Sequence, residues 1–195
     1  MPNSDSLFAT NDQLLWQQFR KGDTVALGQL SKKYYRSLFN YATRFTRDTM
    51  LIEDCIQDMF LKLWERRGFV GDTQSVKFYL LKTLRHQLIK HHQHQLPEDA
   101  WDESNEQADE ETIESQLISQ ENWSSTTQQL NNRLSALPKR QREALYLRYY
   151  ENLSYEQIAQ TMNINAQSVA NLLQNSLRRL RDLWTYVLWL FLLQF

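Results

Sequence analysis

A short turn, Asn163-Ile164-Asn165, separates two amphipathic segments near the C-terminus and leaves few ways for this part of the chain to fold. Two helices cross steeply only where a small side chain lies at their contact, and Ala159 supplies one. The residues spaced to face inward are Ile158, Met162, Ile164, Val169 and Leu172. This pattern predicts a helix-turn-helix over residues 155–174; the alternative is a helical hairpin in the core of a bundle.

Residues with strong positional preferences mark the predicted ends of these helices. Ser154 and Gln157 have the spacing of a capping box, which starts the first helix of the motif. Asn163 tolerates the left-handed conformation that ends it, and Asn165 can cap the last helix, expected to run through residue 181. Pro138 suits the first turn of the preceding helix, where a missing N–H is harmless.

The outward face of the last helix would enter the major groove of DNA. Its residues are Gln167, Ser168, Asn171, Gln174, Asn175 and Arg178. Amide side chains pair with adenine edges and arginine pairs with guanine, so this face favours base recognition. Arg140, Arg142 and Arg148 are candidates for phosphate contacts. For each of these residues the alternative is ordinary solvent exposure.

Composition indicates an all-α chain of two domains. Among 195 residues there are only 4 Gly and 3 Pro, fewer than a sheet protein with many turns would need. The single cysteine, Cys55, excludes an internal disulfide and fits a reducing cytoplasm. No basic start followed by an apolar run is present at the N-terminus, so we expect no signal peptide.

Charge is segregated along the chain although the net charge is only −1. Residues 1–90 carry 14 basic and 9 acidic side chains, and residues 133–195 carry 8 basic and 4 acidic ones. Residues 91–132 carry ten acidic side chains and no Lys or Arg. Two mildly basic blocks joined by an acidic linker suit a polyanionic partner, although ordinary surface charge would give a similar balance.

Four helices are expected in the N-terminal block, over residues 12–21, 24–41, 50–66 and 75–92, with a loop at 68–75. Asp23 or Thr24 can cap the second. The third has the clearest apolar stripe: Ile52, Cys55, Ile56, Met59, Phe60, Leu63 and Trp64. Its opposite side is polar and acidic.

Three stretches resemble the extracytoplasmic-function (ECF) sigma factors of bacterial RNA polymerase, of the kind found in Bacteroidetes. They are IEDCIQDMFLKLWERR, VKFYLLKTLRHQLIKHH and the segment from LPKRQREALYLRYY to LRRLRDLW. The resemblance implies sigma domain two over residues 10–92, an acidic linker over 93–129 and sigma domain four over 130–184. An apolar extension, residues 185–195, would follow.

The family resemblance implies a mechanism and its residues. The polymerase beta-prime clamp helices would receive Asp54, Gln57, Asp58, Leu61 and Glu65, and domain four would meet the beta flap. The −10 promoter element would be held by Lys77, Phe78, Tyr79, Lys82, Arg85 and His86, beside a base pocket in the loop at 68–75. Phe69 is a further aromatic residue near that pocket. His86 and Lys90 differ from the residues usual in the family. The helix-turn-helix would bind the −35 element.

The apolar C-terminal segment, residues 184–195, is too short to span a bilayer as a helix. Surface association with a membrane is one interpretation. The interpretation we favour is an extension of the last helix that packs on a partner, for which an anti-sigma factor is the natural candidate. The resemblance therefore implies a cytoplasmic protein that an anti-sigma factor can hold at the inner membrane.

The sequence gives little support for a metal site or for an enzyme active site. His86, His91, His92 and His94 match no established metal-ligand spacing, and we expect no metal, cofactor, small-molecule substrate or enzymatic activity. The main alternative function is a stand-alone helix-turn-helix regulator with a helical sensor domain. A third is an anti-sigma-like adaptor, which two consecutive DNA-facing domains disfavour.

Overall fold

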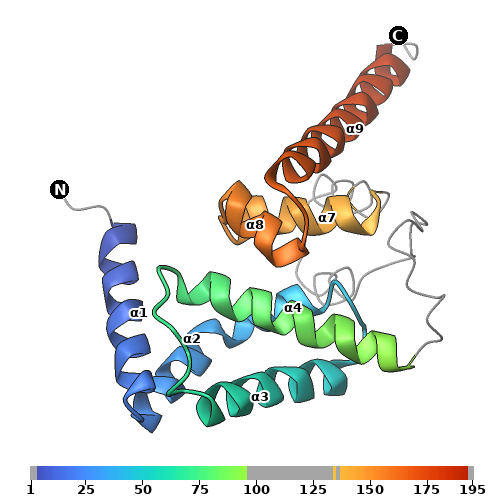
Figure 1. The fold of residues 1–195 in the computed structure, drawn as a ribbon. Coiled ribbons are helices and arrows are strands. Elements are labelled where there is room, and N and C mark those ends of the chain that lie inside the picture. The colour runs from blue at the N-terminus through green and yellow to red at the C-terminus, as the bar shows by residue number, and fades with distance from the viewer. Residues whose placement is uncertain (1–3, 96–133, 135–136, 193–195) are drawn as a thin grey trace. The chain divides into compact units, whose positions relative to one another are not determined.

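The computed structural model describes residues 4–95, 134 and 137–192, with side chains described over 11–91, 134 and 137–181. The chain divides into two compact units, Met1–Glu98 and Asp99–Phe195. Every regular element in the described residues is a helix, which confirms the all-α prediction (Figure 1). The predicted linker lies outside the described residues from residue 96 onward.

In its described residues the first unit has four helices: α1 (Ser4–Arg20), α2 (Thr24–Ala42), α3 (Thr49–Glu65) and α4 (Val76–Gln95). The predicted bounds of α2 and α3 agree with these to within one residue, whereas α1 begins eight residues earlier than expected. Asp23 caps α2, because its carboxylate accepts hydrogen bonds from the backbone N–H groups of Val25 and Ala26. The capping prediction is therefore confirmed for Asp23.

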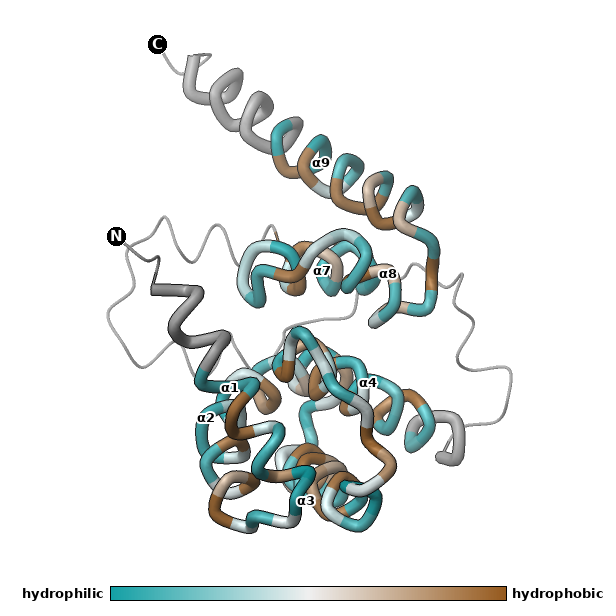
Figure 2. Tube along the Cα trace, turned by 60° about the vertical axis from the view of Figure 1, so that its left-hand side comes forward, coloured by the Kyte–Doolittle hydropathy of each residue, from teal (hydrophilic) through white to brown (hydrophobic). Residues whose placement is uncertain are grey.

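Helix α2 lies against α1, α3 and α4, and the core of the unit fills the space among them. Figure 2 shows apolar and polar stretches alternating along the helices, as amphipathic packing requires. The predicted stripe of α3 is buried except at Trp64, which is half-buried. Cys55 is a buried free thiol whose pKa is raised, chiefly by burial and then by Asp58 and Asp54.

The second unit contains α7 (Lys139–Leu145), a π-helical turn η2 (Tyr146–Tyr150), α8 (Tyr155–Met162) and α9 (Ala166–Leu192). Pro138 is the N-cap of α7, one residue before the first-turn position that we predicted. Helix α9 continues through residue 181 to Leu192, as expected for an apolar C-terminal segment that extends the last helix. No helix in the described part of the chain is long and apolar enough to cross a membrane.

The turn between α8 and α9 has the predicted local structure. The Ser154 hydroxyl accepts from the N–H of Gln157 at 3.2 Å, and the Gln157 side-chain oxygen accepts from the N–H of Ser154 at 2.9 Å. Asn163 is left-handed, with φ 54° and ψ 46°. The Asn165 side-chain oxygen accepts from the N–H of Ser168 at 2.7 Å and so caps α9.

Substitutions of Asn163 test whether the left-handed turn limits stability. We expect Asn163→Ala to lower the free energy of unfolding by about 1 kcal/mol, because a β-carbon without a local polar partner disfavours this conformation. Asn163→Gly should leave the free energy of unfolding within about 0.5 kcal/mol of the parent value. Urea unfolding of the three proteins measures both values. Equal stabilities for the Ala and Gly variants would contradict this account of the turn.

The packing around the turn differs from the prediction at two positions. Ile158, Met162 and Val169 are buried as expected, but Ile164 and Leu172 are only half-buried, and Leu173 takes the inward position expected of Leu172. Positions three and four residues after Val169 both lie near the inward face of a helix with 3.6 residues per turn. The sequence pattern alone does not distinguish them, and the contact with α8 and α7 decides between them.

Candidate nucleic-acid interface

One exposed row of side chains runs along α9 immediately after the turn. Gln167, Asn171, Gln174 and Arg178 follow one another at intervals of four, three and four residues, so they share one face. All four are exposed. Gln167 donates a hydrogen bond to the side-chain oxygen of Asn171 at 3.2 Å. We call these four residues the α9 row; their groups match adenine and guanine edges in the major groove.

The remaining residues predicted for this interface differ in exposure. Asn175 is exposed and accepts a hydrogen bond from the Arg178 guanidinium at 3.2 Å, whereas Ser168 is half-buried. Arg148 is half-buried, donates to the backbone oxygen of Leu153 at 2.8 Å and lies over the Tyr155 ring. Its guanidinium therefore supports the entry to α8 in addition to any role with phosphate. Arg140 and Arg142 are also half-buried.

Helix α3 presents a second candidate surface on the side opposite its buried stripe. Its members, which we call the α3 polar face, are Asp54, Gln57, Asp58, Leu61 and Glu65, and all are exposed. Leu61 is 56% exposed, a large apolar side chain among carboxylates. An apolar centre with a polar rim is the general arrangement of a protein-binding surface.

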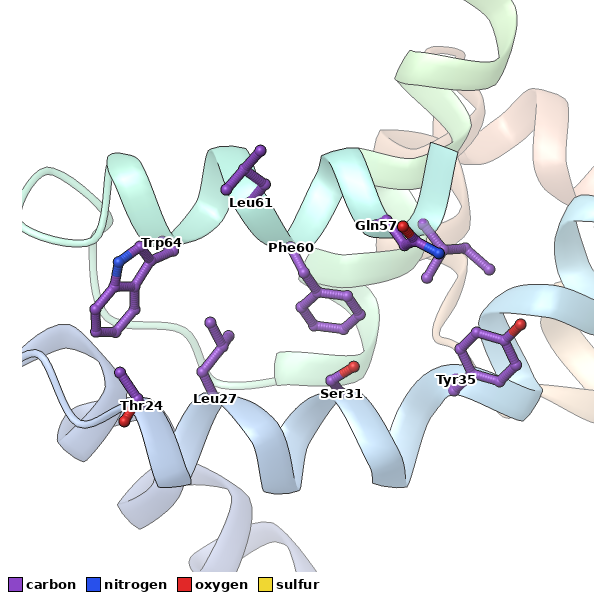
Figure 3. A pocket seen from close by; sticks show the side chains of 9 residues that line it. Thr24, Leu27, Ser31, Tyr35, Gln57, Phe60, Leu61 and Trp64 are labelled. Atoms are coloured by element: carbon purple, nitrogen blue, oxygen red, sulfur yellow. The ribbon is translucent and has the colours of Figure 1, made fainter. Parts of the chain in front are cut away.

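A groove of about 500 Å³ lies between α2 and α3 beside this face. Figure 3 shows Phe60 and Trp64 pointing from α3 toward α2, with Leu27 pointing back from α2. Gln57 and Leu61 contribute to the lining, so the groove adjoins the α3 polar face. The full lining is Thr24, Leu27, Ser31, Tyr35, Ile56, Gln57, Phe60, Leu61 and Trp64.

The six residues predicted to hold the −10 element do not form one exposed surface. Lys82 and His86 are exposed, while Lys77, Phe78 and Tyr79 are half-buried. The Tyr79 ring packs edge-on against Trp16, with centroids 5.0 Å apart. Arg85 is buried, because it shares the inward row of α4 with Leu81 and Leu88 at intervals of four and three residues. Tyr79 and Arg85 therefore serve internal packing first.

Phe69, an aromatic residue expected near the base pocket, is not among these six residues. It lies in the loop between α3 and α4 and is 93% exposed, whereas its neighbour Val70 is buried. The segment Gly68-Phe69-Val70-Gly71 offered a hint, since an aromatic ring in a loop flanked by glycines has little local reason to be buried. Lys82 and Phe78 lie nearby in sequence, with the ammonium 5.7 Å from the Phe78 ring centre.

Comparison with known proteins identifies both units. A family model described as Sigma-70 region 2 matches residues 30–95, and one described as Sigma-70, region 4 matches residues 127–180. Together the two matches cover more than half of the chain. The chain belongs to the sigma-70 family. As a sigma factor it binds core RNA polymerase, directs it to specific promoters and initiates transcription.

Relatives of similar length place this sigma factor in the ECF type. The ECF RNA polymerase sigma factor SigK of Mycobacterium sp. (strain JLS) is 23% identical over 182 residues, which cover 90% of this chain and 92% of that protein. The RNA polymerase sigma-H factor of Pseudomonas aeruginosa is 28% identical over 162 residues, covering 77% of this chain and 82% of the relative.

Solved structures share the fold of this sigma factor. CnrH, solved in complex with the cytosolic domain of CnrY, matches with a TM-score of 0.61 and 16% identity over 90% of this chain and 98% of that one. RpoE, solved with the anti-sigma factor NepR from Bartonella quintana, matches with a TM-score of 0.57 and 18% identity. That match covers 81% of this chain and 96% of RpoE.

Metal binding finds no support in the described residues, where no group of three or more His, Cys, Asp or Glu side chains could hold a metal ion. His92 and His94, which we considered in the sequence, lie outside the residues whose side chains are described.

Proposed function

We propose that this ECF-type sigma factor reads the −35 element with the α9 row and docks on core polymerase through the α3 polar face. The observation that carries the proposal is the α9 row itself, four exposed amide and guanidinium side chains that begin one turn after a sharp helix–helix junction. Asn175 and Ser168 flank the row on the next stripe of the helix. Bidentate contacts from such groups give base discrimination of about 1–3 kcal/mol each.

Core polymerase is the partner we propose for the α3 polar face, through the clamp helices of its beta-prime subunit. Four of the five residues are polar or acidic, and all of them are exposed. The exposed Leu61 and the adjoining apolar groove add a patch that a partner helix can cover. Charge around an apolar centre is the arrangement that gives an interface both affinity and orientation.

For the −10 element we propose that Phe69, at the tip of the loop between α3 and α4, stacks on an unpaired base. The ring is almost fully exposed, and base stacking on aromatic rings needs no particular sequence. Lys82 and His86, both exposed on α4, would contact the adjacent backbone and bases, and Lys77 and Phe78 would complete the surface. Tyr79 and Arg85 would act mainly through packing.

Phe69→Ala tests this role. We expect the variant holoenzyme to bind a single-stranded −10 oligonucleotide about 5- to 150-fold more weakly, which corresponds to the usual 1–3 kcal/mol of one stacked base. Stability should hardly change, because the ring is exposed. Fluorescence anisotropy of a labelled oligonucleotide measures the affinity, and Val25→Ala, another exposed apolar residue, is the control. An unchanged affinity in Phe69→Ala would remove Phe69 from the −10 site.

An anti-sigma factor is a further proposed partner. The solved structure of RpoE is a complex with its anti-sigma factor NepR, and the described fold of the present chain is similar. The apolar residues 184–195 are our candidate segment for such contact, and the cytoplasmic protein would then be held at the inner membrane by its partner.

Deleting residues 184–195 should weaken binding to the anti-sigma factor; unchanged binding and solubility would end this proposal.

The domain boundaries and two further assignments rest on the sequence. We propose domain two over residues 10–92, an acidic linker over 93–129, domain four over 130–184 and an apolar extension over 185–195. We also propose that the chain belongs among the Bacteroidetes-type ECF factors, and that its domain four meets the beta flap of polymerase.

A footprint on promoter DNA distinguishes the proposed function from a stand-alone regulator. Because the α9 row carries a single cationic side chain, Arg178, we expect weak binding to DNA by the free protein. Adding core polymerase should produce protection over both promoter elements. Full protection by the protein alone, without polymerase, would favour the regulator.

A further inference from the structure

The loop between α3 and α4 is tied to α1 by two contacts that span more than fifty residues of sequence. The indole N–H of Trp16 donates a hydrogen bond to the backbone oxygen of Gly71 at 3.2 Å. One residue further along the loop, Asp72 forms an ion pair with the Arg20 guanidinium, with the Nη1 and Oδ1 atoms 2.7 Å apart. Both contacts hold the C-terminal half of the loop.

The other half of the loop is held by contacts with α3. The Arg67 guanidinium lies 4.3 Å from the centre of the Trp64 ring and donates to the backbone oxygen of Trp64 at 2.8 Å. The N–H groups of Phe69 and Val70 both donate to the backbone oxygen of Arg66, which forms a tight turn. Phe69 therefore stands between two fixed halves of the loop.

Trp16 makes a rigid anchor for this loop. Its side chain is buried, and its ring lies 5.2 Å from that of Phe19 on the same helix and 5.0 Å from that of Tyr79 on α4. The ring thus joins α1, α4 and the loop at one point. By contrast, the Asp72 side chain is exposed and that of Arg20 is half-buried, and an ion pair at the surface contributes little to overall stability.

We propose that Trp16 and Arg20 are positioning residues. They fix the loop so that Phe69 already has, before DNA binds, the conformation in which it stacks on an unpaired promoter base. The inference rests on the −10 role proposed above for Phe69. Ordering a loop before binding avoids part of the conformational entropy that binding would otherwise cost. Neither residue needs to touch DNA for this effect.

The ion pair offers a test that separates positioning from structural support. We expect Arg20→Ala and Asp72→Ala each to weaken binding of the holoenzyme to a forked oligonucleotide with a single-stranded −10 segment about three- to tenfold. The charge-exchanged variant, Arg20→Asp with Asp72→Arg, should recover most of the lost affinity. Lys21→Ala, which removes a neighbouring exposed charge from the end of α1, is the matched control and should bind like the parent.

A double-mutant cycle with Phe69→Ala completes the test. If Arg20 acts through Phe69, Arg20→Ala should cause no further loss of affinity in the Phe69→Ala background. Equal losses in both backgrounds, or no recovery in the charge-exchanged variant, would overturn the positioning role. No loss in Phe69→Ala alone would instead overturn the −10 role on which the inference rests. Thermal unfolding and core-polymerase affinity should stay at parent values in Arg20→Ala.

Trp16→Phe supplies a second variant, because it keeps an aromatic ring in the core but removes the N–H donor to Gly71. Trp16→Phe is also combined with Phe69→Ala in a double-mutant cycle. A loss of DNA affinity that disappears in the Phe69→Ala background supports the positioning role, and an equal loss of affinity in both backgrounds contradicts it. Forked-oligonucleotide anisotropy gives the affinity for each protein.

Discussion

Reversing the charges of Asp54 and Asp58 together, by Asp54→Lys and Asp58→Lys, is expected to weaken binding to core RNA polymerase at least about 100-fold. Both side chains are exposed on the α3 polar face, and each reversal replaces attraction by repulsion of similar size. Like charges facing each other across an interface cost several kcal/mol, and about 1.4 kcal/mol corresponds to a tenfold change in affinity. Titration of labelled core enzyme with the sigma factor measures the loss.

The stability of the α3 double variant should hardly change. The only described ion pair that it breaks is the exposed one between Asp58 and Lys62, at 3.4 Å, and such pairs contribute about 0–1 kcal/mol. Gln17→Lys with Gln29→Lys adds positive charge at exposed positions of α1 and α2 and serves as the control. An affinity equal to that of the control would contradict the proposed docking face.

Val169→Asp is expected to unfold the helix-turn-helix and abolish transcription that depends on the −35 element. Val169 is 0% exposed near the start of α9, and an unpaired carboxylate buried there costs several kcal/mol. Such a cost is a large fraction of the stability of a small domain. Because the first unit has its own core, affinity for core polymerase should fall much less than −35 recognition.

Asn171→Asp is the matched variant for Val169→Asp. It introduces the same group two residues further along α9, but at an exposed position. The helix should stay folded, while repulsion from phosphate and loss of the amide donor remove −35 recognition. Circular dichroism distinguishes the two variants: only Val169→Asp should lose helical signal. A folded, active Val169→Asp protein would show that α8–α9 packing is not needed for promoter recognition.

Local sequence determinants predicted much of this fold because they act over one or two turns. The alternation of Ile52, Ile56 and Met59 at intervals of four and three residues sets the buried side of α3 without help from other elements. Likewise, the capping box at Ser154 and the left-handed turn at Asn163 use only neighbouring backbone groups. These features need no knowledge of the tertiary structure.

Features decided by tertiary contacts could not be predicted from the sequence. Arg85 has the spacing of the inward row of α4, but a charged side chain is rarely buried, and only the packing of α4 in the unit shows that Arg85 is. Leu173 rather than Leu172 is buried because of the contacts of α9 with α7 and α8. The contacts of Trp16 and Arg20 with the loop that carries Phe69 join positions more than fifty residues apart in sequence. No periodicity within the loop records those contacts.

Run-off transcription with core RNA polymerase and a library of promoters tests the central claim most directly. The account predicts that the added protein produces promoter-specific transcripts, and that the active promoters share elements at −35 and −10. It also predicts that Val169→Asp removes the dependence on the −35 element and that Phe69→Ala reduces opening at −10. No promoter-specific transcript from a folded preparation of the parent protein would contradict the account.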